Sequence, residues 1–533
     1  MTRTALLGSL VAALLVLAAP ASGAVPRWQS FDRVPHELPG AGAHAAAATG
    51  WIVGARPGRR AARIARVHGA HAIGRIPGAY ALPTGRARAF AEALRAQRLL
   101  RYAEPDRLLA PASSYERPDG PSPWARSFIV GADLTPPAKP APIGIVDDLV
   151  DASVPDTSQA TIAKHSATRQ VLDGHGTAVA SVAAGKADGQ GVIGIMPGAP
   201  IISFGLKTSS CSEVAKGIDE IALSDAEVLN LSLGTTDDCF LLELAVADAI
   251  YTGTLVIAAS GNELESGNPI VYPAAYPHVL SVGAVDVMKQ PTYFSSTNSA
   301  LDLAAPGDEV PVALPLAFDT KDGVADGVST EDGTSFAAPV VSGVASWLIA
   351  ARPGLGPGQY ADLLRHTATD LGDPGWDAST GFGLVNLAGA LQAPTPKVDP
   401  LEPNDGITYV DGTAYGKPAR YVWKGGRARA LKASVDAVED PTDVYRIRLP
   451  RHRRATITLV PGAGNADLRL YDGRAKGLQV HPLSRSSRGP GARDVVHVVN
   501  HRRKAHSYYV AVVAPSVKSR SFDAQYDLRF TRR

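Results

Sequence analysis

The stretch "PIGIVD", residues 142–147, is a run of apolar residues that ends in a carboxylate. Similar apolar runs follow it in the chain: "PIISFGL" (200–206), "EVLNLSLG" (227–234), "TLVIAAS" (254–260) and "VLSVGAV" (279–285). Helical patterns lie between them, at 177–184, 211–224 and 241–252. Apolar strands that alternate with helices are typical of a parallel sheet covered on both faces. The sequence therefore predicts an α/β fold whose ligands bind beyond the carboxyl ends of the strands.

Two further units flank this region. Between residues 50 and 110, the strand-like runs "WIVGARPG" and "RLLRYAEPDRLL" enclose the helical pattern "RARAFAEALRAQ", which predicts a small α+β unit. From about residue 397, alternating strands and turns without helices predict a separate antiparallel β-sandwich. A chain of 533 residues is long enough for about three such units.

The N-terminus and the overall charge limit where the protein acts. The first 24 residues, "MTRTALLGSLVAALLVLAAPASGA", combine a basic start, an apolar core and small residues, which is typical of a secretory signal peptide. We expect a secreted, extracellular or cell-surface protein without a transmembrane anchor after signal removal, with a retained anchor as the alternative. The net charge of +2 is too small to indicate a nucleic-acid partner, and we expect none.

Three polar residues stand where the predicted strands and helices meet. Asp147 ends the first strand, His175 opens a helix in "LDGHGTAVASVAAG", and Ser335 opens another in "DGTSFAAPVVSGVAS". Each alone has an ordinary explanation, as a turn residue, a structural histidine or a helix cap. Together they supply the nucleophile, the base and the orienting carboxylate of acyl transfer. A helix start also favours negative charge that develops beside Ser335.

The motifs around these residues resemble those of the subtilisin-like serine peptidases. "HGTAVAS" is similar to the family's His motif and "GTSFAAP" to its Ser motif, and the chain order Asp, His, Ser is the family's order. "NLSLG" (230–234), "AASGN" (258–262) and "YPAAYP" (272–277) follow in family order, so the resemblance spans about 142–391. It implies a serine endopeptidase that acts on proteins or peptides. The alternative is a catalytically degenerate binding protein at the cell surface.

The resemblance also implies further site residues. Asn262 would donate its side-chain amide to the oxyanion, beside the backbone N–H of Ser335. The substrate-binding residues would be Ser232, Leu233, Gly234 and Val271. Val271 would form the floor of the pocket for the residue before the scissile bond. Because no acidic residue occupies that floor position, we expect an apolar preference.

The segment after the first strand departs from the family pattern. The family's Asp is usually followed by a small hydroxyl residue and Gly, whereas here Asp148 and Leu149 follow Asp147. Side chains alternate along a strand, so Asp147 and Asp148 point in opposite directions and only one can face His175. We predict that Asp147 does so, with Asp148 as the second candidate. Ala178 replaces a second histidine that is often seen after the His motif.

The flanking units also resemble known accessory domains. The predicted division is a signal peptide (1–24), a leader and propeptide (25–112), a catalytic domain (113–393) and a β-sandwich (394–533). The unit at 50–110 resembles an inhibitor-like propeptide. The resemblance implies a zymogen that processes itself and that its own propeptide inhibits until then. The alternative is a permanent N-terminal domain. The motif "LEPNDG" (401–406) resembles the bacterial pre-peptidase C-terminal domain.

The chain contains only two cysteines, Cys211 and Cys239. An exported chain permits one disulfide. If the preceding strands are neighbours, as in the family, the two thiols lie at one edge of the sheet; two free buried thiols are the alternative. We predict no required cofactor and assign no metal ligand. Family members often bind calcium, so the resemblance allows for a structural calcium ion. The sequence does not indicate which residues would bind it.

Overall fold

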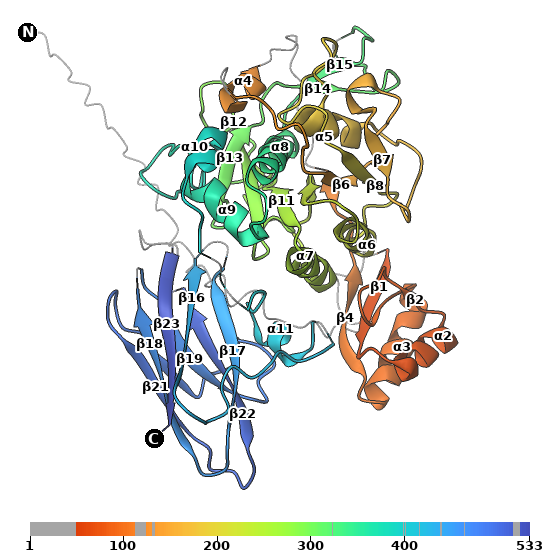
Figure 1. Cartoon of the computed structure of the whole chain (residues 1–533). Helices are drawn as coiled ribbons and strands as arrows, with labels where there is room; N and C mark the ends of the chain where they lie inside the picture. The colour runs from red at the N-terminus through yellow and green to blue at the C-terminus, as the bar shows by residue number, and fades with distance from the viewer. Residues whose placement is uncertain are drawn as a thin grey trace, which may run out of the picture.

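The structure is a computed structural model that describes residues 49–111, 124–130, 134–321, 323–397, 399, 401–414, 416–437, 440–462, 464–514 and 523–532. The predicted signal peptide lies outside the described residues, and so does the leader as far as residue 48. Figure 1 shows a central unit, an N-terminal unit beside its helices α6 and α7, and a C-terminal β-rich unit on the same side. The catalytic site is expected in the central unit.

The central unit is built on a seven-stranded sheet in the order β13-β12-β11-β9-β6-β8-β7, and its strand pairs are parallel. The strands are β6 (Ile143–Asp147), β7 (Ala160–Ile162), β8 (Ile201–Gly205), β9 (Val228–Leu231), β11 (Leu255–Ala259), β12 (Val279–Val285) and β13 (Leu303–Pro306). The predicted α/β fold is confirmed. The edge strands β7 and β13 were not predicted because each is too short to form a recognisable apolar run.

Helices cover both faces of this sheet. On one face lie α5 (His175–Ala184) and α8 (Thr334–Ala351), and on the other α6 (Cys211–Ala222) and α7 (Phe240–Thr252). The smaller elements are α4 (Trp124–Val130), η2 (Pro155–Thr157), α9 (Pro357–His366), α10 (Leu387–Gln392) and the hairpin of β14 (Val310–Ala313) and β15 (Val328–Glu331). The three helical patterns that separate the strands in the sequence agree with α5, α6 and α7 to within a few residues.

The helix α8 runs through the core of the central unit. The helix carries apolar residues on all of its faces. It packs on α5 and on strands β9, β11, β12 and β13. Among the described residues it is the one helix long and apolar enough to cross a membrane, but 89% of it is buried inside the protein. Its length and composition are therefore explained by its place in the core.

The N-terminal unit is a four-stranded antiparallel sheet in the order β2-β3-β1-β4, covered by two helices. Its elements are β1 (Gly50–Ala55), α2 (Arg59–His68), β2 (His71–Ala72), β3 (Ala79–Leu82), α3 (Thr84–Ala96) and β4 (Leu100–Asp106). It contacts the central unit through β4, where Glu104 accepts the backbone N–H groups of Phe240 and Leu241 at the start of α7. Asp106 accepts the N–H of Ser212 in the first turn of α6.

The C-terminal unit consists of two four-stranded antiparallel sheets that share one hydrophobic core. One sheet, in the order β16-β23-β18-β21, contains β16 (Arg429–Asp436), β18 (Arg454–Pro461), β21 (Asp494–Val499) and β23 (Asp523–Arg532). The other, in the order β17-β22-β19-β20, contains β17 (Thr442–Leu449), β19 (Asp467–Asp472), β20 (Ser484–Ser486) and β22 (His506–Val513). The short helix α11 (Ile407–Asp411) precedes them.

Cys211 and Cys239 form a disulfide, which confirms the predicted pair. The expectation that the two preceding strands are neighbours is wrong, because β6 lies between β8 and β9 in the sheet. Cys211 is the first residue of α6 and Cys239 directly precedes α7, so the bond joins the starts of the two helices on the same face of the sheet. The N-terminal unit contacts these same helix starts. The disulfide therefore holds together the surface on which that unit lies.

Close packing of α8 on α5 gives a test of the core. A β-carbon added to Gly343 of α8 would lie 2.6 Å from Cβ of Ile195 and 2.8 Å from the carbonyl oxygen of Ala183. We expect Gly343→Ala to lower the free energy of unfolding by roughly 1–3 kcal/mol, as overpacked cores do, measured by urea denaturation. Gly358→Ala in α9 is the matched control, because nothing lies within 4 Å of its added β-carbon. Equal effects of the two substitutions would contradict this account of the packing.

Candidate active site

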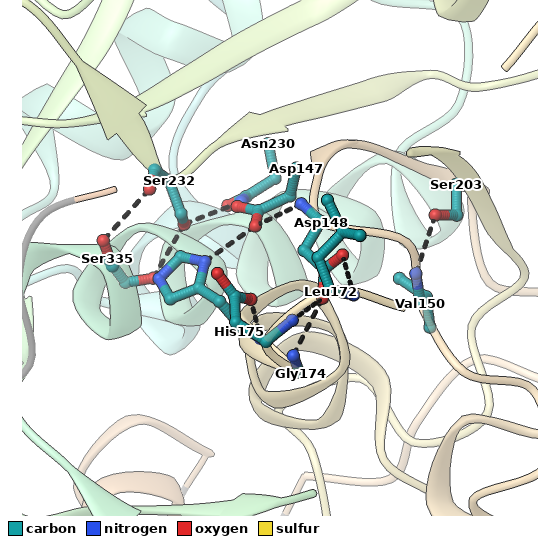
Figure 2. Close-up of polar contacts among 11 residues, drawn as sticks. Asp147, Asp148, Val150, Leu172, Gly174, His175, Ser203, Asn230, Ser232 and Ser335 are labelled. Carbon is teal, nitrogen blue, oxygen red and sulfur yellow. Dashed lines mark hydrogen bonds and ion pairs between the residues drawn. The ribbon is translucent and has the colours of Figure 1, made fainter. Parts of the chain in front are cut away.

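Asp147 and His175 meet at the carboxyl edge of the central sheet. Asp147 is the last residue of β6 and His175 the first of α5, and Oδ1 of Asp147 lies 2.7 Å from Nδ1 of His175. Figure 2 shows the imidazole between this carboxylate and the first turn of α8. The His175 side chain is 13% exposed, and its Nε2 is buried without a hydrogen-bond partner in the described structure. The ring is therefore oriented with one nitrogen on the carboxylate and the other available for a proton.

Asp148 points away from His175 and holds the loop that leads to it. Its Oδ1 accepts the N–H of Leu172 at 2.8 Å, and its Oδ2 accepts those of Asp173 at 3.1 Å and Gly174 at 2.8 Å. Figure 2 shows two of these contacts beside the Asp147–His175 pair. Sequence reasoning offered Asp148 only as a substitute for Asp147. The structure instead places it where it positions the start of α5.

Ser335 lies in the first turn of α8 and is fully buried, with 0% exposure. Its Oγ donates to the carbonyl oxygen of Ser232 at 3.1 Å, and the hydroxyl of Ser232 donates to the carbonyl oxygen of Ser335 at 2.7 Å (Figure 2). The amide of Asn230 in β9 in turn donates to Oγ of Ser232 at 2.9 Å. The start of α8 is thus tied to the end of β9, and Ser335 faces the same edge of the sheet as His175.

Asn262 lies beside the start of α8. Its Oδ1 accepts the backbone N–H of Thr334 at 3.0 Å and the hydroxyl of Thr334 at 2.9 Å. These two bonds fix the amide, and its Nδ2 lies 3.2 Å from where a β-carbon on Gly333 would stand. A side-chain N–H group and the amide groups of a helix start therefore converge next to Ser335. That is the chemistry that binds a developing oxyanion.

Two opposing effects act on the pKa of His175. Burial lowers the pKa because it disfavours the charged imidazolium, while the Asp147 carboxylate raises it through its charge and its hydrogen bond. The net result is a pKa above the ordinary value of histidine. A base in this position is neutral only at higher pH, so chemistry that needs neutral His175 increases with pH through that pKa.

The predicted substrate residues lie on the edge strand next to Ser335. Leu233 and Gly234 form β10, which pairs in antiparallel register with β5 (Ala110–Pro111) from the segment that follows the N-terminal unit. Val271 lies against Gly234. Sequence reasoning did not include Glu263, whose carboxylate lies beside Gly261 on the other side of Val271 and accepts the hydroxyl of Ser296 at 3.2 Å. Only its position one residue after Asn262 could have drawn attention to it.

A second polar cluster lies between the central unit and the sandwich. Two overlapping groups in the described residues could hold a metal ion, and their members are His278, Asp399, Glu402, Asp405, Asp440 and Asp443. His278 precedes β12, and its Nε2 lies 2.9 Å from Oδ1 of Asp405. Burial and neighbouring carboxylates raise the pKa of Asp399 to about 8, and the pKa of Asp443 is also raised. These carboxylates are therefore costly to ionise together without a compensating cation.

Comparison with known proteins agrees with this geometry. The subtilase family model matches residues 139–383. Subtilisin DY of Bacillus licheniformis is 33% identical over 259 residues, which cover 47% of this chain and 90% of that protein. The chain belongs to the subtilase family. Subtilisin E of Bacillus subtilis is also 33% identical, over 65% of its length.

The likeness of fold extends beyond the matched region. Fervidolysin of Fervidobacterium pennivorans is 32% identical over 286 residues, which cover 48% of this chain and 41% of that protein. Its crystal structure, described as that of a keratinolytic enzyme related to subtilisin, superposes with a TM-score of 0.59 at 18% identity. The superposition covers 93% of this subtilase chain and 97% of the other. The overall fold is therefore shared across the flanking units as well.

The Asp147–His175 contact predicts a shift in the pH profile. Because the carboxylate raises the pKa of His175, Asp147→Asn should move the acid limb of peptide hydrolysis to lower pH. It should also reduce turnover by about 10⁴-fold, the loss typical of a misoriented base. The measurement is kcat/KM against pH, on chains released by a protease site introduced after residue 112.

Asp148→Asn is the matched control for this experiment. It removes the neighbouring carboxylate but leaves the Asp147–His175 hydrogen bond in place. We expect the acid limb to stay at the wild-type position, with a smaller loss of turnover. An Asp147→Asn profile whose midpoint equals that of the wild type would show that another group sets the pKa of the base.

Proposed function

We propose that this subtilase is a secreted serine endopeptidase that cleaves peptide bonds through an acyl-enzyme on Ser335. The observation that carries the proposal is the position of His175, held by Asp147 on one side and facing the start of α8 on the other. The rival proposal, a degenerate binding protein, drew on the unusual sequence of Asp147, Asp148 and Leu149. That segment still brings a carboxylate to His175, which favours the enzyme.

The reaction follows from the positions of these groups. Nε2 of His175 accepts the proton of Ser335 as Oγ turns from the carbonyl of Ser232 to attack the scissile carbonyl. Asn262 and the backbone N–H of Ser335 stabilise the oxyanion of the tetrahedral intermediate. His175 then protonates the leaving amine, and a water molecule hydrolyses the acyl-enzyme in the reverse sequence. Asp147 keeps Nδ1 protonated and stabilises the imidazolium throughout.

The N-terminal unit is proposed to be a propeptide that inhibits the enzyme until it is removed. One observation supports this proposal: β5 pairs with β10 in antiparallel register, as an added peptide strand would. Glu104 and Asp106 also bind the starts of α7 and α6, where backbone N–H groups lack helical partners. A signal peptide at 1–24 and a cleavage junction near Ala110 to Ser114 complete the proposed zymogen.

The substrate is proposed to bind as an extra strand on β10. Leu233 and Gly234 would pair with the substrate backbone, as they pair with Pro111 and Ala110. The next residue of a chain in this register falls opposite Ser232, whose carbonyl oxygen is hydrogen-bonded to Ser335. This register puts the carbonyl group of that residue within reach of the nucleophile. Val271 borders the place where its side chain would go.

The acidic cluster is proposed to hold a structural calcium ion. Calcium prefers carboxylate and amide oxygens, which this cluster offers in excess. Two of the carboxylate oxygens, Oδ1 of Asp399 and Oδ1 of Asp440, are buried without a hydrogen-bond partner among the described residues, and so is the amide oxygen of Asn404, whose Nδ2 donates to Asp443. A bound cation would neutralise the carboxylates and join the sandwich to the central unit. Asp399, Glu402, Asp405, Asp440 and Asp443 are the acidic residues that would hold it.

Covalent labelling tests the proposed activity. We expect a fluorophosphonate probe to label the secreted wild-type protein and not Ser335→Ala, because only an activated serine reacts. The wild type should also shorten itself to an N-terminus near residue 113, while Ser335→Ala keeps the N-terminal unit. Mass spectrometry reads both results. A wild-type protein that neither labels nor shortens itself would favour the binding protein.

Removal of calcium tests the acidic cluster. A chelator should lower the thermal unfolding midpoint of the wild type, and added calcium should restore it. A free calcium concentration of 100 times the dissociation constant raises the free energy of unfolding by about 2.7 kcal/mol. Asp440→Asn should abolish this dependence. Asp527→Asn, the same change at an exposed ion pair with Lys432, should leave it intact. A midpoint that does not respond to the chelator would argue against a structural calcium.

A further inference from the structure

Two neighbouring chain segments separate at the edge of the sheet next to Ser335. Strands β9 and β11 are parallel neighbours, with Leu231 opposite Ala258. Beyond this pair, one segment continues to Gly234 and the other to Gly261 and Asn262. In parallel sheets, ligands bind outside the carboxyl ends of the strands, and this gap lies at that edge. A substrate residue opposite Ser232, with its carbonyl at Ser335, would direct its side chain into this gap.

Val271 occupies the gap. Its side chain is buried, with the residue 4% exposed, and it contacts both glycines. A β-carbon on Gly234 would stand inside van der Waals distance of Cγ1 of Val271, and one on Gly261 would stand 2.6 Å from Cγ2. One methyl group of Val271 therefore touches each wall. No space for a further carbon atom remains between Val271 and either glycine.

The surroundings hold Val271 in this position. The next residue, Tyr272, exchanges two backbone hydrogen bonds with Thr235, at 2.9 and 2.8 Å, so this segment is tied to the end of β10. The carbonyl oxygen of Val271 also accepts the N–H of Ala275 at 3.0 Å. The carboxylate of Glu263 also lies against Gly261, beside Val271, and accepts the hydroxyl of Ser296. These bonds fix the backbone from which the Val271 side chain projects toward Gly234 and Gly261.

We propose that Val271 restricts the residue before the scissile bond to glycine, alanine or a side chain of similar size, which narrows the general apolar preference expected from the sequence. The proposal rests on the proposed peptidase function and names the substrate class of that site. A methyl group needs little depth between Gly234 and Gly261, whereas Leu, Phe or Lys requires the volume that Val271 fills. A single methylene in a closed pocket changes selectivity by about 10- to 200-fold, so an aromatic ring is strongly excluded.

The chain's own sequence at the edge strand agrees with this restriction. The segment paired with β10 contains Ala110 and Pro111, and the sequence continues with Ala112, Ser113 and Ser114. Each residue from 110 to 114 is therefore small or cyclic, whereas Leu109 and Tyr115 flank this stretch. The first peptide that the site must accept is this one, and it presents no large side chain to the gap.

Quenched fluorescent peptides that differ only in the residue before the scissile bond test the proposal. The wild-type protein, expressed as the full chain and allowed to process itself, should cleave the Ala peptide at least about 100-fold more efficiently, by kcat/KM, than the Phe or Lys peptide. Val271→Gly should raise the Phe-to-Ala ratio of kcat/KM at least about tenfold, and Val271→Ala by a smaller factor. Val271→Thr is the matched control, since it keeps the number of side-chain atoms and the branching at Cβ and should leave Phe excluded.

The possible results separate this inference from the peptidase function. A wild type that cleaves the Phe peptide as fast as the Ala peptide overturns the size restriction while the peptidase function stands. If the wild type prefers the Ala peptide and the Phe-to-Ala ratio of kcat/KM is the same in Val271→Gly and Val271→Ala as in the wild type, a residue other than Val271 sets the size limit. A protein that cleaves no peptide and does not react with the fluorophosphonate probe overturns the proposed function and this inference with it.

Discussion

The burial of one apolar helix, α8, determines much of this structure. A helix with apolar residues on every side must be surrounded by other elements, and here the sheet lies on one side and α5 on the other. Its few polar side chains are satisfied inside the core: Ser342 donates to Asn230 at 2.9 Å and Ser346 to the carbonyl of Ala141 at 2.6 Å. The start of the helix is thereby held at the sheet edge, with Ser335 in its first turn. The proposed nucleophile is therefore carried by a rigid element and needs little reorganisation to react.

Adjacent residues have separate roles at this edge. Asp147 orients His175, and Asp148 binds the backbone of the loop before it, because successive side chains leave a strand in opposite directions. Gly176 completes the arrangement, since a β-carbon there would collide with the carbonyl oxygen of Asp148. The departure from the family pattern therefore retains the carboxylate that faces the base and adds a second that positions it.

The flanking units contact the central unit at features that bear on the site. The N-terminal unit contacts the starts of α6 and α7, which the disulfide joins, and its continuation covers the substrate strand. The sandwich approaches through the acidic cluster, which includes His278 at the end of the segment that begins with Val271. The N-terminal unit and its continuation thus reach the strand beside Ser335, and the sandwich contacts the segment that precedes β12.

The sequence by itself determined the α/β class, the positions of the main strands and helices, and the residue types of the site, because apolar periodicity and local motifs record these directly. It also indicated Cys211 and Cys239 as a possible pair. Only the tertiary structure decided what Asp148 binds, how completely Val271 fills the gap between Gly234 and Gly261, and which acidic residues gather around His278. Each of these depends on distances between segments far apart in the chain. Such distances are set by the packing of the whole core, and no local pattern contains them.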